Sequence, residues 1–134
     1  MPGWGTGSFE NEYAQDFLGR LNSLEIDDLR QILARAADRE YLETAESSTT
    51  VAAAAVVAAL VAAARDETAS QATPKQIFDW MSKTAGVPPD LAGLARRAVE
   101  RVRTNSELKD LWLEAEGLNE WSASLRDLQQ RLSG

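Results

Sequence analysis

Apolar residues recur at three- and four-residue steps along most of this chain, and that spacing places them on one face of an α-helix. Seven segments show this pattern, and none shows the strict alternation of a half-buried β-strand. The first helix is predicted to begin at the N-cap Asn11, the second at Ser23 and the third at Thr44. The pattern therefore predicts an all-α protein of six or seven helices.

The third helix is predicted to be central because it is apolar on every side. From Val51 to Ala64 the chain has 14 residues, nine of them alanine. A helix that is hydrophobic all round is normally enclosed by its neighbours. We expect it to end near Arg65. Its apolar run is shorter than the roughly 17–25 residues of a membrane-crossing helix, so no membrane span is predicted.

The second half of the chain has clear start and stop signals. Thr73 and Pro74 mark the start of a fourth helix that ends at Gly86. Thr104 has capping-box spacing for a sixth helix, which Gly117 closes. We expect the fifth and last helices to bury apolar faces inside the domain, formed by Leu91, Leu94, Ala95, Ala98 and Val102 and by Trp121, Leu125, Leu128 and Leu132.

A glycine-rich arm precedes the helices. Residues 1–9 hold three glycines at alternate positions together with Trp4 and Phe9. Ordering so much glycine costs conformational entropy, which only burial of the two rings would offset. We expect Trp4 and Phe9 to anchor the arm on the helical bundle of residues 10–134, so that the chain forms a single compact domain. The alternative is an arm that binds another molecule.

Composition limits the chemistry of the chain. Cysteine and histidine are both absent, which removes disulfides, the commonest general base and the commonest transition-metal ligand. We therefore predict no catalytic residues, no metal and no cofactor. No basic, apolar signal-peptide pattern is present at the N-terminus, so we expect a cytoplasmic protein.

The net charge of −7 lies entirely in the first half of the chain. Residues 1–67 carry twelve acidic and five basic side chains, whereas residues 68–134 carry nine of each. Negative charge disfavours binding to nucleic acid or to an anionic membrane. It is compatible with a basic protein partner, although solubility alone would also explain it. The candidate partner contacts are Asp27, Asp28, Glu43 and Glu46.

Two further charge patterns have simpler interpretations. Glu12 and Asp16 lie one helical turn apart and would be able to share a cation, but negative charge near a helix start is favourable in itself. Four arginines of the fifth helix suggest an anion or acidic-peptide site. A solvated face partly neutralised by Glu100 is the interpretation that we favour. These arginines are Arg96, Arg97, Arg101 and Arg103.

Two motifs carry a family resemblance. The arm reads GWGTGSFEN at residues 3–11, and a later segment reads SELKDLW at residues 106–112, followed by Trp121. Together they resemble the bacterial domain of unknown function 4259 family, which has no established activity. Members often carry glutamate where this chain has Ala55 and Leu113, so no role of those acids transfers to this chain.

These observations favour a small, acidic, non-enzymatic protein that binds a protein partner. Toxin-neutralising (immunity-type) proteins are one class with this size and charge. The alternative is a structural or oligomerising helical module, and an enzyme of unknown reaction is a third hypothesis. We expect a monomer or a weak homodimer that binds neither nucleic acid nor membrane.

The arm gives a direct test. If Trp4 is buried against the protein's own helices, Trp4→Ala should lower the free energy of unfolding by about 3–5 kcal/mol, a large part of the stability of a native domain. Thermal melting and partner binding should be measured on the same variant. An unchanged melting temperature with lost binding would identify the arm as a binding element instead.

Overall fold

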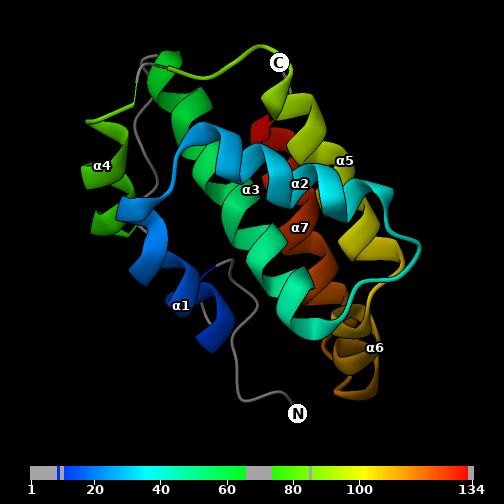
Figure 1. The fold of residues 1–134 in the computed structure, drawn as a ribbon. Coiled ribbons are helices and arrows are strands. Elements are labelled where there is room, and N and C mark those ends of the chain that lie inside the picture. The colour runs from blue at the N-terminus through cyan, green and yellow to red at the C-terminus, as the bar shows by residue number, and fades with distance from the viewer. Residues whose placement is uncertain (1–8, 10, 66–73, 85, 133–134) are drawn as a thin grey trace.

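Helices make up almost all of the regular structure (Figure 1). The computed structural model describes residues 9, 11–65, 74–84 and 86–132, which contain seven α-helices, one short 3-10 helix and no strand. The predicted all-α fold is confirmed. The elements are α1 (Glu12–Arg20), η1 (Leu21–Ser23), α2 (Ile26–Asp38), α3 (Thr44–Ala64), α4 (Lys75–Met81), α5 (Leu91–Thr104), α6 (Glu107–Glu114) and α7 (Leu118–Leu132).

The alanine-rich helix α3 occupies the centre of the bundle, as predicted. All six other α-helices pack against it or against its immediate neighbours, with α2 crossing in front of it and α7 behind it in Figure 1. Ala52, Ala53 and Ala54 are completely buried on successive sides of α3. Side chains this small let the neighbouring helices approach the α3 backbone closely.

Burial also explains the unusual hydropathy of α3. The helix has 21 residues, and by length and composition alone it would be able to cross a membrane. However, 72% of its most apolar 18-residue window is buried inside the bundle, as in the core helix of a soluble protein. Its apolar surface is therefore used in packing against other helices.

The apolar faces predicted in the second half are inside the structure. Trp112 and Trp121 are each only 3% exposed, and the α7 seam continues through Leu125, Leu128 and Leu132, all buried. Trp80 is also buried, and its indole N–H donates a hydrogen bond of 2.8 Å to the Leu24 carbonyl. The last helix is thus packed within its own domain, as expected.

The predicted cap of the second helix, Ser23, is wrong by two residues, because the N-cap is Glu25. The Ser23 hydroxyl donates to the Arg20 carbonyl at 2.7 Å and belongs to η1. Helix α2 starts at Ile26 instead, where the Asp28 carboxylate accepts a hydrogen bond of 2.8 Å from the Glu25 backbone N–H. An acidic capping interaction therefore replaces the predicted serine cap.

Of the caps predicted for α1 and α6, the first is confirmed and the second is wrong. Asn11 caps α1 as predicted, since its side-chain oxygen accepts a hydrogen bond of 2.9 Å from the Ala14 N–H. Thr104 is not the cap of α6, because it is the last residue of α5. Ser106 takes that role and accepts from the Lys109 N–H at 3.0 Å. The predicted cap Thr73 lies outside the described residues.

A clasp joins the α2–α3 loop to the junction between α5 and α6. Leu42 donates its N–H to the Asn105 carbonyl at 3.3 Å and accepts from the Glu107 N–H at 2.8 Å. The Glu107 carboxylate accepts from the N–H and the hydroxyl of Thr44 at 2.9 and 2.6 Å. Thr44, predicted to cap α3, is therefore its first residue, and Glu107 caps the helix from a distant part of the chain.

The clasp also changes the titration of two side chains. The hydrogen bonds from Thr44 hold the pKa of Glu107 below its usual range. Tyr41 donates its phenolic hydrogen to the Asp110 carboxylate at 2.7 Å, and this bond raises the pKa of Tyr41 to about 12. The pKa of Tyr41 is higher in the folded protein than the ordinary value of 10.0, so the protonated phenol stabilises the fold. This stabilisation is fully present below pH 10 and is lost as the pH rises toward 12.

Helix α6 ends in a Schellman motif whose left-handed residue is not glycine. Glu116 has a φ of 60° and donates to the Leu113 carbonyl at 3.2 Å, while Gly117 donates to the Trp112 carbonyl at 3.0 Å. A β-carbon on Gly117 would lie 2.6 Å from Cε3 of the Trp112 ring. Gly117 follows the helix as predicted. A glycine is needed there because the indole of Trp112 approaches its backbone closely, and the left-handed residue is Glu116.

Ultraviolet titration of the Tyr41 hydroxyl tests the clasp. In Asp110→Asn the carboxylate acceptor is lost, so the pKa of Tyr41 should fall from about 12 toward the ordinary value of 10.0. The chain has a second tyrosine, so both proteins should also carry Tyr13→Phe, which leaves Tyr41 as the one phenol that is observed. Identical titration curves for the two proteins would show that this hydrogen bond does not form in solution.

Substitutions at adjacent positions test the end of α6. Glu116→Gly should raise the free energy of unfolding by up to about 1 kcal/mol, since a left-handed conformation is unfavourable for a residue with a β-carbon. Gly117→Ala should lower it by about 1–3 kcal/mol because the methyl group would collide with the Trp112 ring. Chemical denaturation measures both. Glu116→Ala is the control, and a gain from it equal to that of Glu116→Gly would contradict the conformational explanation.

Candidate functional site

The carboxylates considered as cation ligands do not form a metal centre in the described part of the chain. No group of three or more Asp or Glu side chains lies close enough there to hold an ion. Glu12 and Asp16 are both exposed on α1, and Glu12 occupies its first turn. The position of Glu12 fits a favourable interaction with the helix start, whereas Asp16 lies one turn further along α1.

The structure separates the four predicted partner contacts into two pairs. Asp27 and Asp28 lie in the first turn of α2, whereas Glu43 and Glu46 lie at the start of α3, beyond the other end of α2. At 1.5 Å per residue the two ends of α2 are roughly 15–20 Å apart. The four carboxylates therefore do not form one cluster.

Only two of these four carboxylates lack a partner among the described residues. Asp28 caps its own helix, and Glu46 accepts a hydrogen bond of 3.1 Å from Arg39. Asp27 and Glu43 are exposed and form no side-chain hydrogen bond or ion pair within the described ranges. These two are free to meet a positively charged surface.

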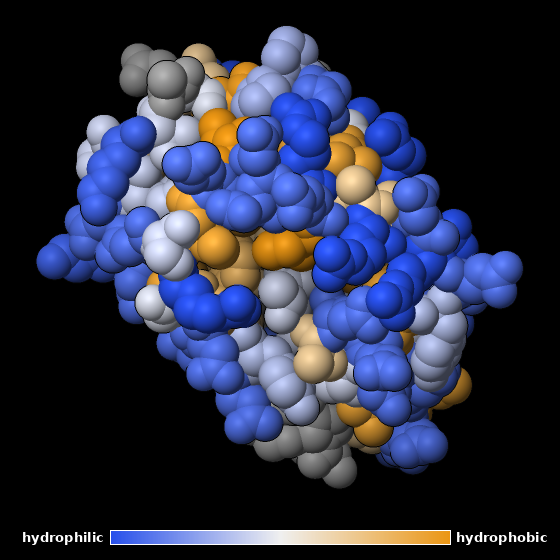
Figure 2. Space-filling model, in the orientation of Figure 1, coloured by the Kyte–Doolittle hydropathy of each residue, from blue (hydrophilic) through white to orange (hydrophobic). Residues whose placement is uncertain are grey.

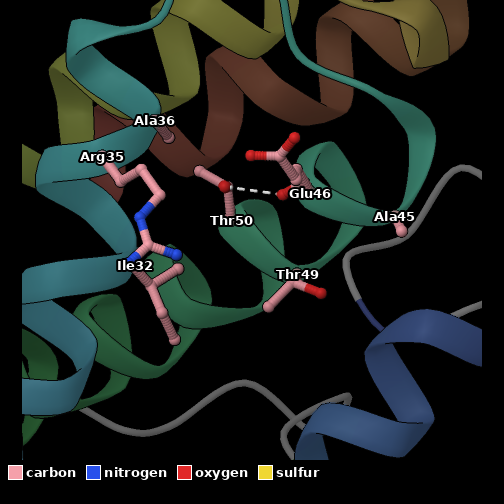
Figure 3. A pocket seen from close by; sticks show the side chains of 7 residues that line it. All are labelled: Ile32, Arg35, Ala36, Ala45, Glu46, Thr49 and Thr50. Carbon is pink, nitrogen blue, oxygen red and sulfur yellow. Dashed lines mark hydrogen bonds between the residues drawn. The ribbon is translucent and has the colours of Figure 1, made fainter.

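An open groove lies between the carboxyl half of α2 and the first turns of α3 (Figure 3). Its cavity volume is about 210 Å³. Short and apolar side chains form its interior, and charged side chains stand at its rim. The lining residues are Ile32, Arg35 and Ala36 of α2 and Ala45, Glu46, Thr49 and Thr50 of α3.

Local bonding keeps this groove open. The Thr50 hydroxyl turns back to donate to the Glu46 carbonyl at 2.7 Å, so it does not extend across the groove. Ala36 and Ala45 end in methyl groups that are too short to fill the space. Apolar surface is correspondingly exposed near the middle of the face shown in Figure 2, among hydrophilic side chains. Sequence reasoning missed this groove, although it did identify Glu46.

The groove rim carries both signs of charge. Arg35 is exposed and has no hydrogen-bond or ion-pair partner within the described ranges. Glu46 retains 32% of its side-chain exposure, and only its Oε1 atom is engaged by Arg39. A ligand on this face therefore meets an unpaired guanidinium on one wall and an accessible carboxylate on the other.

The arginines of α5 are neutralised only in part. Glu100 forms a bidentate pair with Arg103, the shortest contact being 2.6 Å, and also accepts from Gln129 of α7 at 3.0 Å. These donors hold the pKa of Glu100 below its usual range. Arg96 and Arg97 remain exposed on the surface. The group mainly ties α5 to α7.

An ion pair also connects α2 to the start of α5. Arg30 of α2 pairs with Asp90, the residue before α5, and this hydrogen bond lowers the pKa of the Asp90 carboxyl. The pair is solvent-exposed and therefore contributes little stability. It links the middle of α2 to the residue before α5, on which α2 also packs.

The predicted arm anchors have different outcomes. Phe9 is partly buried and packs against the hydrophobic core, and its carbonyl accepts a hydrogen bond of 2.7 Å from the Gln15 side chain. This contact agrees with the expected position of the ring, while the role of Phe9 as an anchor of the arm stays a prediction. Trp4 lies outside the described residues, so its role stays a prediction.

Comparison with known proteins identifies the family. A family model with the description "Domain of unknown function (DUF4259)" matches residues 3–124. Searches of curated proteins and of solved structures gave no match. The matched range includes the arm, the central helix α3 and the motif whose Ser106 and Glu107 cap two helices. The chain belongs to the DUF4259 family.

Proposed function

We propose that this protein works by binding another protein, without catalysing a reaction, through the face formed by α2 and the start of α3. The observation that carries the proposal is the groove on this face, which combines an uncovered apolar interior with charges at its rim. A groove of this kind accepts an apolar side chain of a partner, while the charged rim selects its orientation.

The free carboxylates support the same face. Asp27 lies at one end of α2 and Glu43 beyond the other, with the groove between them. A standard protein interface buries about 800 Å² on each partner, which is enough to cover both ends of the helix. The acidic character of residues 1–67 favours a basic partner. A toxin-neutralising role in the cytoplasm is one form that such binding takes.

The alternative function, an oligomerising module that uses its last helix, receives less support. Trp121, Leu125 and Leu128 of α7 are all buried inside the domain, so this seam is not available to a second copy. Catalysis remains the third hypothesis. No catalytic constellation supports it among the described residues.

Charge reversal tests the proposal. Asp27→Lys together with Glu43→Lys should slow association with a basic partner on the order of tenfold, and association of the original protein should slow as salt is added. Neither side chain supports the fold through a described bond, so thermal melting should change little. The first probe is the purified product of the adjacent upstream gene, and the second is protein captured from a cell lysate.

The matched control reverses two exposed acids of the second half, Glu114 and Glu120, to lysine. This control changes the net charge by the same amount but lies on α6 and α7, so it should leave binding largely intact. Capture of an acidic partner, or binding that is indifferent to salt, would contradict the electrostatic part of the proposal.

A further inference from the structure

The groove between α2 and α3 has charges arranged so that it complements a second copy of itself. Arg35 stands on the α2 wall and Glu46 on the α3 wall, with Thr50 between them in Figure 3. When two copies face each other, a two-fold axis that runs along the groove places the α2 wall of each copy opposite the α3 wall of the other. Each Arg35 then faces the Glu46 of the other copy.

We propose that two copies of this protein associate face to face through this groove, in a two-fold dimer held by two identical Arg35–Glu46 ion pairs. Both groups are available for it. Arg35 is exposed and has no partner in the described ranges, and the Oε2 atom of Glu46 is not used by Arg39. Arg39 instead holds the Glu46 carboxylate in place beside the groove.

The interior of the groove supplies the apolar part of the contact. Ile32 is only partly buried in the free protein, and across the axis it lies over Ala45 and Thr49 of the other copy. Burial of these side chains gives a contact that is small compared with the 1,200–2,000 Å² typical of stable interfaces. The dimer is therefore weak and depends on protein concentration.

The overall charge of the protein does not prevent this pairing. Each copy carries a net charge of −7, but at physiological ionic strength charges more than about 8 Å apart are largely screened. The two pairs at the contact are closer than this. The unpaired carboxylates of Asp27 and Glu43 lie at the two ends of the same face, so their repulsion weakens the dimer further. The pairing is a property of the free protein and does not rest on the proposed function; a partner that binds the same face would compete with it.

Sedimentation velocity over a range of concentrations tests the dimer with the full chain. Arg35→Glu places like charges opposite Glu46, and Glu46→Arg places like charges opposite Arg35, so each single variant should dissociate at least about tenfold more readily. An equal mixture of the two variants should restore association, because both cross-pairs then have opposite charges. The double variant R35E/E46R should also associate.

Arg97→Glu, an exposed reversal on α5, is the matched control and should leave the dimer unchanged. Because Glu46→Arg also breaks the pair with Arg39, recovery in the mixture shows that its fold is intact. Three results would overturn the proposal: an original protein that stays monomeric at every concentration, dimers that persist in both single variants, or a mixture that fails to associate. A failure here leaves the capture experiment with Asp27 and Glu43 unaffected.

Discussion

Close packing of helices around α3 is the constraint on which the rest of the structure depends. Neighbouring helices approach a central helix closely where its side chains are short, and Ala52, Ala53 and Ala54 of α3 are completely buried. The bulk of the core is then contributed by the surrounding helices, for example by Phe17 and Leu33. A larger side chain on α3 would separate several helices at once, since interiors have little free volume.

Enclosure of α3 creates a second requirement at its start. The first backbone N–H groups of a helix have no partner within it, and Glu43, the residue before α3, provides no side-chain cap. Glu107 meets this need from α6 by accepting two hydrogen bonds from Thr44. The SELKDLW segment of residues 106–112 thus has a physical role, because Ser106 caps α6 while the next residue, Glu107, caps the central helix.

Prediction from sequence succeeded for the helices, whose apolar residues recur at regular spacing. It failed for features that depend on contacts with a distant segment of the chain. The spacing of Phe17, Leu125 and their counterparts correctly identified the helices and most of the core. The start of α3 was misassigned because a carboxylate 63 residues away replaces the local cap. The groove was not predictable, since it depends on how far apart α2 and α3 lie. Ile32 fits the apolar stripe of α2, yet it is only partly buried at that groove.

The same clasp that satisfies the start of α3 also determines the shape of the candidate binding face. Thr44 is held by Glu107, and Glu46 follows only two residues later at the groove rim. Core packing places α2 and α3, the two walls of the groove, and the bond from Glu107 holds the first residue of the acidic wall. The exposed pair of Arg30 and Asp90 links the opposing helix α2 to the start of α5. Within the groove, Ala36 belongs to the core and Ile32 packs against it. Arg35 and the Oε2 atom of Glu46 are the groups that remain available to a binding partner.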